Sequence, residues 1–411
     1  MSARPTLVLV DALTTGAMLA RAAAADHRVV HVRSRAELPE TFAASLPTEV
    51  FAEDLTYPGR ADEVLARLRA QAPFAVIAAS EFGVEVADEL AGRLGLRGND
   101  PALSPARRDK SRMMEVLAAA GVPTPRQLRG SDLTELLDWR RTQGLARVVV
   151  KPLDSAGSED VYTCDTEQEV AAALRAALGK TNLMLCANEA VLIQEHLAGD
   201  EYVVNSVSRD GKHWFTDAWI SRKQVTSGKR LVYDHEDLLP PDAPVLDEIL
   251  DYVGRVLDGL GIAHGPAHTE LILTPHGPRL LETGARLSGL ANPPALQRCT
   301  GADQVTLTLD SHTSRAAALR SRPRRYVRHE SARCVNLLAH REVPLPTHAL
   351  RAALERLPAF ESVRFRKADC TPTRPTVDLN SSPGVVFLVH RDPEEIESSY
   401  KMLRAVEREL L

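Results

Sequence analysis

The stretch GPAHTELILTPHGPRLLETGARLSG, residues 265–289, contains two short segments, 269–273 and 279–281, on either side of a turn rich in proline and glycine at 275–278. This pattern predicts an antiparallel hairpin. Because the turn centre falls near residues 276 and 277, Glu270 and Glu282 lie almost opposite each other, and opposite Cβ atoms are about 5 Å apart. Two carboxylates at that spacing repel unless a cation separates them or one is protonated.

Oxygen ligands of this kind suit Mg²⁺, which usually also keeps phosphate and water ligands. Arg286 follows Glu282 by four residues, where a guanidinium could hold a phosphate or carboxylate through two hydrogen bonds. Strand alternation places His268 on the same face as Glu270, either lining a substrate pocket or making a structural hydrogen bond. The alternative for the whole stretch is an edge hairpin with solvated acids.

Lysine is rare in this chain: of 50 basic residues, eight are lysine and 42 are arginine. Codon usage in a GC-rich genome explains the imbalance most simply, so the positions that keep lysine are worth examining. Lys110 precedes an expected helix at 111–120, and Lys151 ends an expected buried strand at 147–151, where an ammonium is costly without an anion. The small residues at 154–158 would let backbone N–H groups approach a phosphate. The alternatives are a solvated lysine and an ordinary surface turn.

A further polar stretch follows an expected strand at 191–194 and ends at Glu201. A backbone hinge of this type can contact the edge of an adenine, and the carboxylate can accept ribose hydroxyls. A plain strand-to-turn transition is the alternative. The polar segment 221–235 is interpreted as either a loop that closes over the substrates or a surface loop.

Strands and helices alternate over the first hundred residues, which predicts a parallel sheet with helices on both faces. The expected strands are 6–10, 28–32, 50–52 and 74–79, and the expected helices are 17–25, 61–72 and 84–94. No G-x-G-x-x-G motif is present, so a dinucleotide site in this part is not expected. Residues 101–105 are interpreted as a linker, and helices at 247–260, 347–357 and 394–410 and strands at 202–206, 332–338 and 384–389 follow.

Composition sets the broad class of the protein. With 411 residues, 44% hydrophobic and 26% charged, we expect a soluble protein of two to three domains. The net charge of -5 argues against a general binder of nucleic acid or of anionic membranes, and no apolar run is long enough to span a bilayer. Five scattered cysteines fit a reducing compartment, so we expect a cytoplasmic protein.

The order of these motifs along the chain resembles that of ATP-grasp enzymes. Three segments further resemble the carboxylate–amine ligases that join amino acids: Ala79-Ser80-Glu81-Phe82-Gly83, His268-Thr269-Glu270 and Glu282-Thr283-Gly284-Ala285-Arg286. The resemblance implies an α/β protein with the α+β ATP-grasp fold. Its expected domains are an N-terminal Rossmann-like domain at 1–100, an ATP-grasp domain at 101–315 and a small C-terminal α/β domain at 316–411.

The resemblance also implies roles for individual residues. Lys110 and Lys151 would contact the ATP phosphates, and Arg286 and Lys151 would be catalytic. Further ATP contacts would come from a lid and a hinge, formed by Ser155, Ala156, Gly157, Ser158, Gln194, Glu195, His196, Leu197 and Glu201. Glu270 and Glu282 would hold Mg²⁺ or Mn²⁺. The substrates would be bound by His268, Arg286, Ser288, Gly289 and Glu81.

One departure from the family pattern concerns Gly284, because many members have an asparagine metal ligand at this position. The second metal ion would then be held more by water and phosphate, or bound weakly. Similar small residues occur in the amino-acid ligase branch, so Gly284 does not imply a loss of activity.

The implied activity is an ATP-dependent ligase that joins the carboxylate of one amino acid to the amine of another through an acyl phosphate, with release of ADP and phosphate. The product would be a dipeptide or a γ-glutamyl-type amide of secondary metabolism. Two alternatives remain open: a carboxylase or other carboxylate-activating ATP-grasp enzyme of primary metabolism, and a non-catalytic ATP-binding protein. The expected partners are amino acids rather than nucleic acid or membrane, and a homodimer is common in this superfamily.

Overall fold

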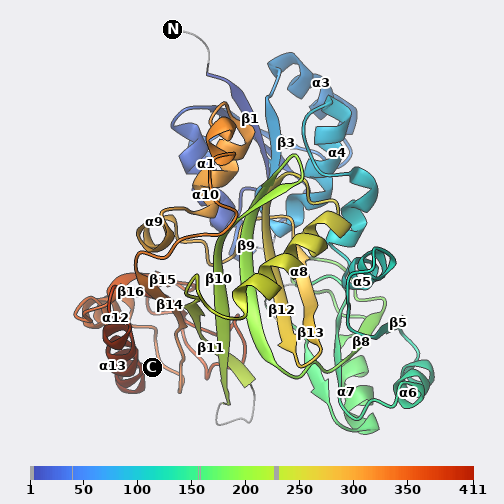
Figure 1. Ribbon diagram of the computed structural model, residues 1–411, viewed down its shortest axis with the longest axis vertical. Coiled ribbons are helices and arrows are strands. Elements are labelled where there is room, and N and C mark those ends of the chain that lie inside the picture. Colours follow the sequence, from blue (N-terminus) through green and yellow to red (C-terminus); the bar gives the residue numbers. More distant parts are fainter. Residues whose placement is uncertain (1–3, 39, 156, 158, 226–230) are drawn as a thin grey trace.

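The computed structural model describes residues 4–411 apart from 39, 156, 158 and 226–230, and within these residues the strands form three β-sheets (Figure 1). The first sheet has the order β3-β2-β1-β4, and each neighbouring pair is parallel. Its strands are β1 (Thr6–Val10), β2 (Arg28–Arg33), β3 (Glu53–Thr56) and β4 (Ala75–Ala78). The predicted parallel sheet is therefore confirmed.

Helices cover both faces of this sheet, as the sequence predicts. Alternate residues of β1 point to opposite faces, so Val8 and Val10 pack with α3 (Ala61–Gln71) and α4 (Val84–Leu94). Leu7 and Leu9 pack with α1 (Thr15–Ala24) on the other side. The predicted strand at 50–52 was misplaced, because residues Thr48–Val50 form a 3₁₀ turn and the strand begins only at Glu53.

The segment predicted as a linker is instead an ordered connection. A 3₁₀ helix, η3 (Pro101–Arg107), leads into α5 (Lys110–Ala119). The Arg107 side chain is fully buried, with Nη2 2.7 Å from a carboxylate oxygen of Asp88 and Nη1 donating to the carbonyl of Leu260 at 2.8 Å. A buried guanidinium requires such acceptors, so Arg107 fixes the N-terminal part of the molecule against the central part.

The second sheet is antiparallel and has the order β5-β8-β6-β7. Its strands are β5 (Gln127–Gly130), β6 (Val148–Pro152), β7 (Tyr162–Cys164) and β8 (Val191–Glu195). Helices α6 (Leu133–Thr142) and α7 (Glu167–Ala177) bury apolar side chains against one face of the sheet. The opposite face is left for the cavity described below.

The third sheet has eight strands in the order β13-β12-β9-β10-β11-β14-β16-β15. These are β9 (Asp200–Arg209), β10 (Lys212–Val225), β11 (Leu231–Leu238), β12 (Gly265–Thr274), β13 (Gly277–Gly284), β14 (Ser331–Asn336), β15 (Phe360–Phe365) and β16 (Gly384–His390). Strands from the segments 101–315 and 316–411 thus share one sheet, and the boundaries at 100 and 315 stay predictions.

Helices cover the outer face of this sheet (Figure 1). The apolar side of α8 (Leu246–Gly259) packs across its central strands. At the C-terminal end, α12 (Thr347–Leu354) and α13 (Pro393–Leu410) cover β14, β15 and β16. The remaining helices are α2 (Glu40–Ala43), α9 (Pro293–Thr300), α10 (Gln304–His312) and α11 (Ala316–Leu319), with the 3₁₀ turn η2 (Glu81–Gly83).

The polar segment 221–235 was predicted as a loop, and this was wrong for its described residues. They continue β10 and form much of β11, which pair antiparallel; residues 226–230 lie outside the described part of the chain. Several side chains of this pair face a polar cavity, which explains why the sequence lacks the apolar alternation of a half-buried strand. Among the described residues, no helix combines the length and apolar character required to cross a bilayer.

Candidate active site

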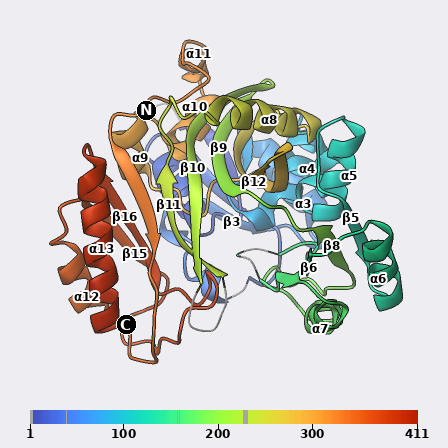
Figure 2. The ribbon, with the colours of Figure 1, turned by 60° about the horizontal axis from the view of Figure 1, so that its bottom comes forward.

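A cavity of about 500 Å³ lies between the antiparallel sheet β5-β8-β6-β7 and the eight-stranded sheet. In Figure 2 the small sheet, with β6 and β8, lies to the right of β10 and β11, and the C-terminal strands and α13 lie to the left. Most of the predicted site residues line this single cavity: Lys110, Lys151, Ser155, Gly157, Gln194, Glu195, His196, Leu197, Glu201, His268, Glu270, Glu282, Arg286, Ser288 and Gly289. Ala156 and Ser158 lie outside the described residues.

The predicted hairpin is present as β12 and β13, and Glu270 and Glu282 are direct partners in its register. The Nε2 atom of His268 lies 3.2 Å from a carboxylate oxygen of Glu270, and its Nδ1 atom lies 2.8 Å from Oδ1 of Asn205, both at hydrogen-bond distance. Burial alone would raise the pKa of Glu270, but the hydrogen bond and charge of His268, together with the charges of Arg286 and Lys223, lower that pKa to about 2. Glu270 is thus a carboxylate that His268 holds in place.

The two lysines singled out in the sequence, Lys110 and Lys151, differ in their electrostatic surroundings. Lys110 begins α5, whose N-cap is Asp109, and its Nζ lies 2.6 Å from Glu282 and donates to the carbonyl of Ser155 at 3.2 Å.

 Burial lowers the pKa of Lys151, and repulsion from Lys110 lowers it further, to about 8. No ion pair to Lys151 occurs among the described residues. A buried ammonium without a carboxylate partner favours an anionic ligand such as a phosphate.

The predicted adenine hinge lies at the end of β8 and beyond it. Gln194, Glu195, His196 and Leu197 line the cavity, together with apolar side chains such as Ile272 and Leu281 from the hairpin. The Glu195 carboxylate is turned toward Arg126, which donates to it from Nε at 2.8 Å and from the backbone N–H at 2.9 Å. The side chain of Glu195 is therefore engaged, and its backbone N–H also donates to the carbonyl of Arg126, at 3.0 Å.

Glu201, predicted as the ribose contact, is buried at the start of β9. Lys223 on β10 donates to one of its oxygens at 2.6 Å, and Tyr233 on β11 donates to the other at 2.8 Å. The β10–β11 pair thus reaches over the cavity and fixes this acid. Gly157 in the predicted lid has φ of 66°, a left-handed conformation that favours glycine.

Glu81, predicted as a substrate contact, lines a small adjoining cavity rather than the main one. One carboxylate oxygen accepts from Nε of Arg286 at 2.6 Å, and the other contacts Arg108. Burial would raise the pKa of Glu81, but the two guanidinium groups lower it to about 2. Glu81 therefore positions Arg286, and its role as a substrate contact stays a prediction.

This ion pair gives a physical reason for Gly284. A Cβ at position 284 would lie 2.8 Å from a carboxylate oxygen of Glu81 and 3.3 Å from Nε of Arg286. Any side chain there would displace the pair. The absence of a side chain at position 284 thus leaves room for the Glu81–Arg286 contact.

Several residues of the cavity wall were missed by the sequence interpretation. They are Lys223, Tyr233 and Glu236 from β10 and β11, and Asn336, Arg366 and Asn380 from the C-terminal part of the chain. Lys223 could have been found, because it is one of only eight lysines in an arginine-rich chain. Nothing in the sequence marks the C-terminal residues, since they reach the cavity only because β14 continues the central sheet.

Comparisons with known proteins agree with this architecture. The family model of the ATP-grasp domain matches residues 145–293. Dapdiamide A synthase of Enterobacter agglomerans is 31% identical over 410 residues, which cover 98% of this chain and 95% of that enzyme.

Solved structures show the same fold. An L-amino acid ligase from Bacillus licheniformis matches with a TM-score of 0.74 and 19% identity, over 98% of both chains. A carboxyaminoimidazole ribonucleotide synthase from Aspergillus clavatus, complexed with ATP, matches with a TM-score of 0.73 and 12% identity, over 99% of both chains. The near full-length similarity to dapdiamide A synthase and the geometry of the cavity lead to one conclusion: the chain belongs to the ATP-grasp superfamily, in its branch of ATP-dependent carboxylate–amine ligases.

Proposed function

We propose that this enzyme joins the carboxylate of one amino acid to the amine of another through an acyl phosphate and releases ADP and phosphate. The main observation in support is that Glu270 and Glu282 face each other in one cavity, which Lys110, Lys151 and Arg286 also line. Two acids and three cations converge there, as phosphoryl transfer from ATP to a carboxylate requires. The likeness to dapdiamide A synthase supports an amide product of secondary metabolism.

In this proposal, ATP lies along the cavity with its adenine at residues 194–197 and its ribose at Glu201. Apolar side chains that line the cavity near the hinge suit a base, and the buried Lys151 and the half-buried Lys110 suit the phosphates. Binding of the phosphates would give Lys151 the anion that it lacks among the described residues, which offsets the cost of its burial. Ser155, whose carbonyl accepts from Lys110, and Gly157 also line the cavity and would cover the phosphates.

The donor set fits a divalent cation. In the described part of the chain, no three His, Cys, Asp or Glu side chains are grouped to hold a metal by themselves, so a cation at Glu270 and Glu282 would need phosphate and water as further ligands. Such a donor set suits Mg²⁺. When bound, Mg²⁺ would offset negative charge on the phosphates. Lys110 is in contact with Glu282 and would exchange this partner for a phosphate oxygen.

The chain's own residues would then control two displacements. In the first, an oxygen of the donor carboxylate attacks the γ-phosphorus, the bond to the β,γ-bridging oxygen breaks, and ADP leaves. In the second, the neutral amine of the acceptor attacks the carbonyl carbon, phosphate leaves, and the amine loses a proton. Arg286, held by Glu81, can stabilise negative charge in both steps. Exclusion of water between the two sheets protects the acyl phosphate from hydrolysis.

The direct test is ADP release with pairs of free amino acids, combined with mass spectrometry of the product. We expect ADP formation to require two amino acids and to match amide formation one to one. Formation of AMP coupled to product would contradict the proposal. ADP release that depends on bicarbonate instead of an amine would favour the carboxylase alternative, and binding of ATP without turnover on any substrate would favour the non-catalytic one.

A further inference from the structure

Arg366 places a cation in the cavity wall, and no carboxylate among the described residues forms an ion pair with it. The residue directly follows β15, and its exposed side chain lines the cavity. NH1 donates to Oγ of Ser382 at 2.8 Å, and NH2 donates to Oδ1 of Asn336 at 3.1 Å. These acceptors are neutral, and none of the ion pairs found among the described residues includes Arg366. The guanidinium is therefore oriented by the protein but keeps its charge for a ligand.

Glu236 in the same cavity is an acidic residue, and among the described residues it has no ion pair with a cation. It lies on β11, and Oγ of Ser221 donates to it at 3.4 Å. No cation forms an ion pair with Glu236 within the described part of the chain. Burial raises the pKa of its carboxyl, and the nearby acids Glu270 and Glu201 raise it further, to about 8. A cationic group of a ligand would relieve this unfavourable environment.

The sheet register brings these two side chains to one wall. Glu236 is the direct partner of Cys334 on β14, and Asn336, which holds Arg366, lies two residues further along that strand. Residues two apart on a strand share a face and are separated by about 6.6 Å. A carboxylate and a guanidinium, each without an ionic partner among the described residues, thus lie within reach of one small zwitterion.

We propose that Glu236 and Arg366 form the subsite of the acceptor amino acid, with Arg366 binding its carboxylate and Glu236 its amino group. The inference rests on the proposed function and deepens it. The donor's carboxylate must lie beside Arg286 and the ATP phosphates, whereas the acceptor keeps its carboxylate in the product. A guanidinium remote from the phosphates can hold that group through two parallel hydrogen bonds, so the enzyme would select α-amino acids over simple amines and amino-acid amides.

The test compares Arg366→Met with wild-type enzyme and with Lys367→Met, which removes one positive charge from the next residue, outside the cavity lining. For the productive pair found by ADP release, kcat/KM is measured with the acceptor amino acid and with its carboxamide. We expect Arg366→Met to lower kcat/KM for the acid by about 30-fold or more, because a charged hydrogen-bonded partner is lost. The carboxamide should react equally well with both proteins, and Lys367→Met should behave as wild type.

The KM for ATP and the thermal midpoint show whether Arg366→Met is folded, and Arg366→Lys, which keeps the charge but not the fork, should fall between wild type and Arg366→Met. Unchanged preference for the acid over the carboxamide in folded Arg366→Met would overturn the assignment. If product analysis shows that the lost preference concerns the donor, the assignment to the acceptor is also wrong.

A second readout separates this inference from the proposed function. If no pair of amino acids supports ADP release, calorimetric titration of the ADP-bound protein with each proteinogenic amino acid and its carboxamide still tests the subsite. We expect wild type to bind at least one amino acid but not its carboxamide, and both Arg366→Met and Glu236→Gln to lose that binding. Equal binding of acid and carboxamide, or binding of no amino acid at all, would refute the subsite.

Discussion

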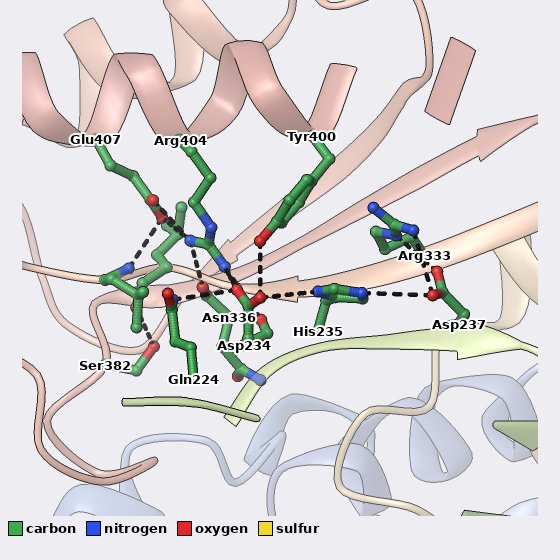
Figure 3. Close-up of polar contacts among 12 residues, drawn as sticks. Gln224, Asp234, His235, Asp237, Arg333, Asn336, Ser382, Tyr400, Arg404 and Glu407 are labelled. Carbon is green, nitrogen blue, oxygen red and sulfur yellow. Dashed lines mark hydrogen bonds and ion pairs between the residues drawn. The ribbon is translucent and has the colours of Figure 1, made fainter. Parts of the chain in front are cut away.

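The charged side chains on the two sides of β11 and β14 differ in whether they form ion pairs. Beneath α13, charged side chains form a paired cluster, which we call the α13 network: Asp234, His235, Asp237, Arg333, Tyr400, Arg404 and Glu407 (Figure 3). Arg404 contacts both Asp234 and Glu407, and Arg333 contacts Asp237 at 2.6 Å. In the cavity, by contrast, the described residues offer no ionic partner to Lys151, Glu236 or Arg366. Paired charges hold elements together, whereas unpaired charges are available to ligands.

Asn336 lies where the two regions meet. Its backbone carbonyl accepts from Arg404 of the α13 network at 3.1 Å, and its side chain accepts from Arg366 in the cavity. A β-bulge explains how β11 serves both regions. His235 pairs with Arg222 and Tyr233 with Lys223, so Asp234 is the extra residue and contacts Arg404 and Tyr400, whereas Tyr233 and Glu236 line the cavity.

The largest effect should come from the cavity, through Glu282→Gln. Loss of this carboxylate removes one of the two facing acids and the contact with Lys110, so we expect ADP-forming turnover to fall by about 10²–10³-fold. Glu248→Gln, which changes an exposed acid on α8 away from the cavity, should retain turnover. Turnover of Glu282→Gln within a few-fold of wild type would show that this acid is not part of the machinery.

The next effect should come from the α13 network, through Arg404→Met. This change leaves Asp234 and Glu407 without their main cation, and breaking a buried pair costs about 3–5 kcal/mol of unfolding free energy. Turnover per folded molecule should stay unchanged. Lys401→Met on the same helix, with 72% of its side chain exposed, should change stability by less than about 0.5 kcal/mol. Equal unfolding curves for the two variants would contradict the distinction between the regions.

A smaller, pH-dependent effect is expected for Asp234→Asn. Burial would raise the pKa of Asp234, but the hydrogen bond to His235 and the charge of Arg404 lower it from 3.8 to about 2. A lowered folded-state pKa stabilises the fold above pH 3.8, and this contribution is lost as pH falls through about 2. Urea unfolding near neutral pH should therefore show a loss of about 2 kcal/mol, and the gap should narrow below pH 3.8. A gap that stays constant with pH would rule out this origin.

The smallest change in stability is expected for Lys151→Met. This variant should be more stable than wild type, whereas Arg404→Met and Asp234→Asn should be less stable. The fold keeps a buried ammonium whose pKa is lowered to about 8, so removing it should raise the unfolding free energy of the nucleotide-free protein by about 1 kcal/mol. ATP turnover should be lost at the same time. Lys180→Met, at an exposed lysine paired with Asp160, should show neither effect. A Lys151→Met variant that is less stable than wild type would show that the charge is satisfied in the fold.

Local sequence patterns predicted the elements that depend on neighbouring residues. The helix at 84–94 and the strand at 6–10 have the predicted bounds, because the helix keeps its apolar spacing throughout and the strand is one continuous buried run. The hairpin was predicted because its turn fixes which residues face each other, so Glu270 and Glu282 could be paired from their spacing alone. The segment 221–235 could not be predicted in this way, because its polar side chains face a cavity that other parts of the chain create.

By itself, the sequence determined the motifs of the proposed nucleotide site and their order: two lysines, a hinge, and a hairpin with two acids and an arginine. These features are local, so spacing reveals them. Only the tertiary structure decided that Glu81 holds Arg286, that a bulge separates Asp234 from Glu236, and that Arg366 reaches the cavity. Each of these depends on contacts between distant segments. The pattern within one segment cannot predict which charged side chain will form an ion pair with another segment.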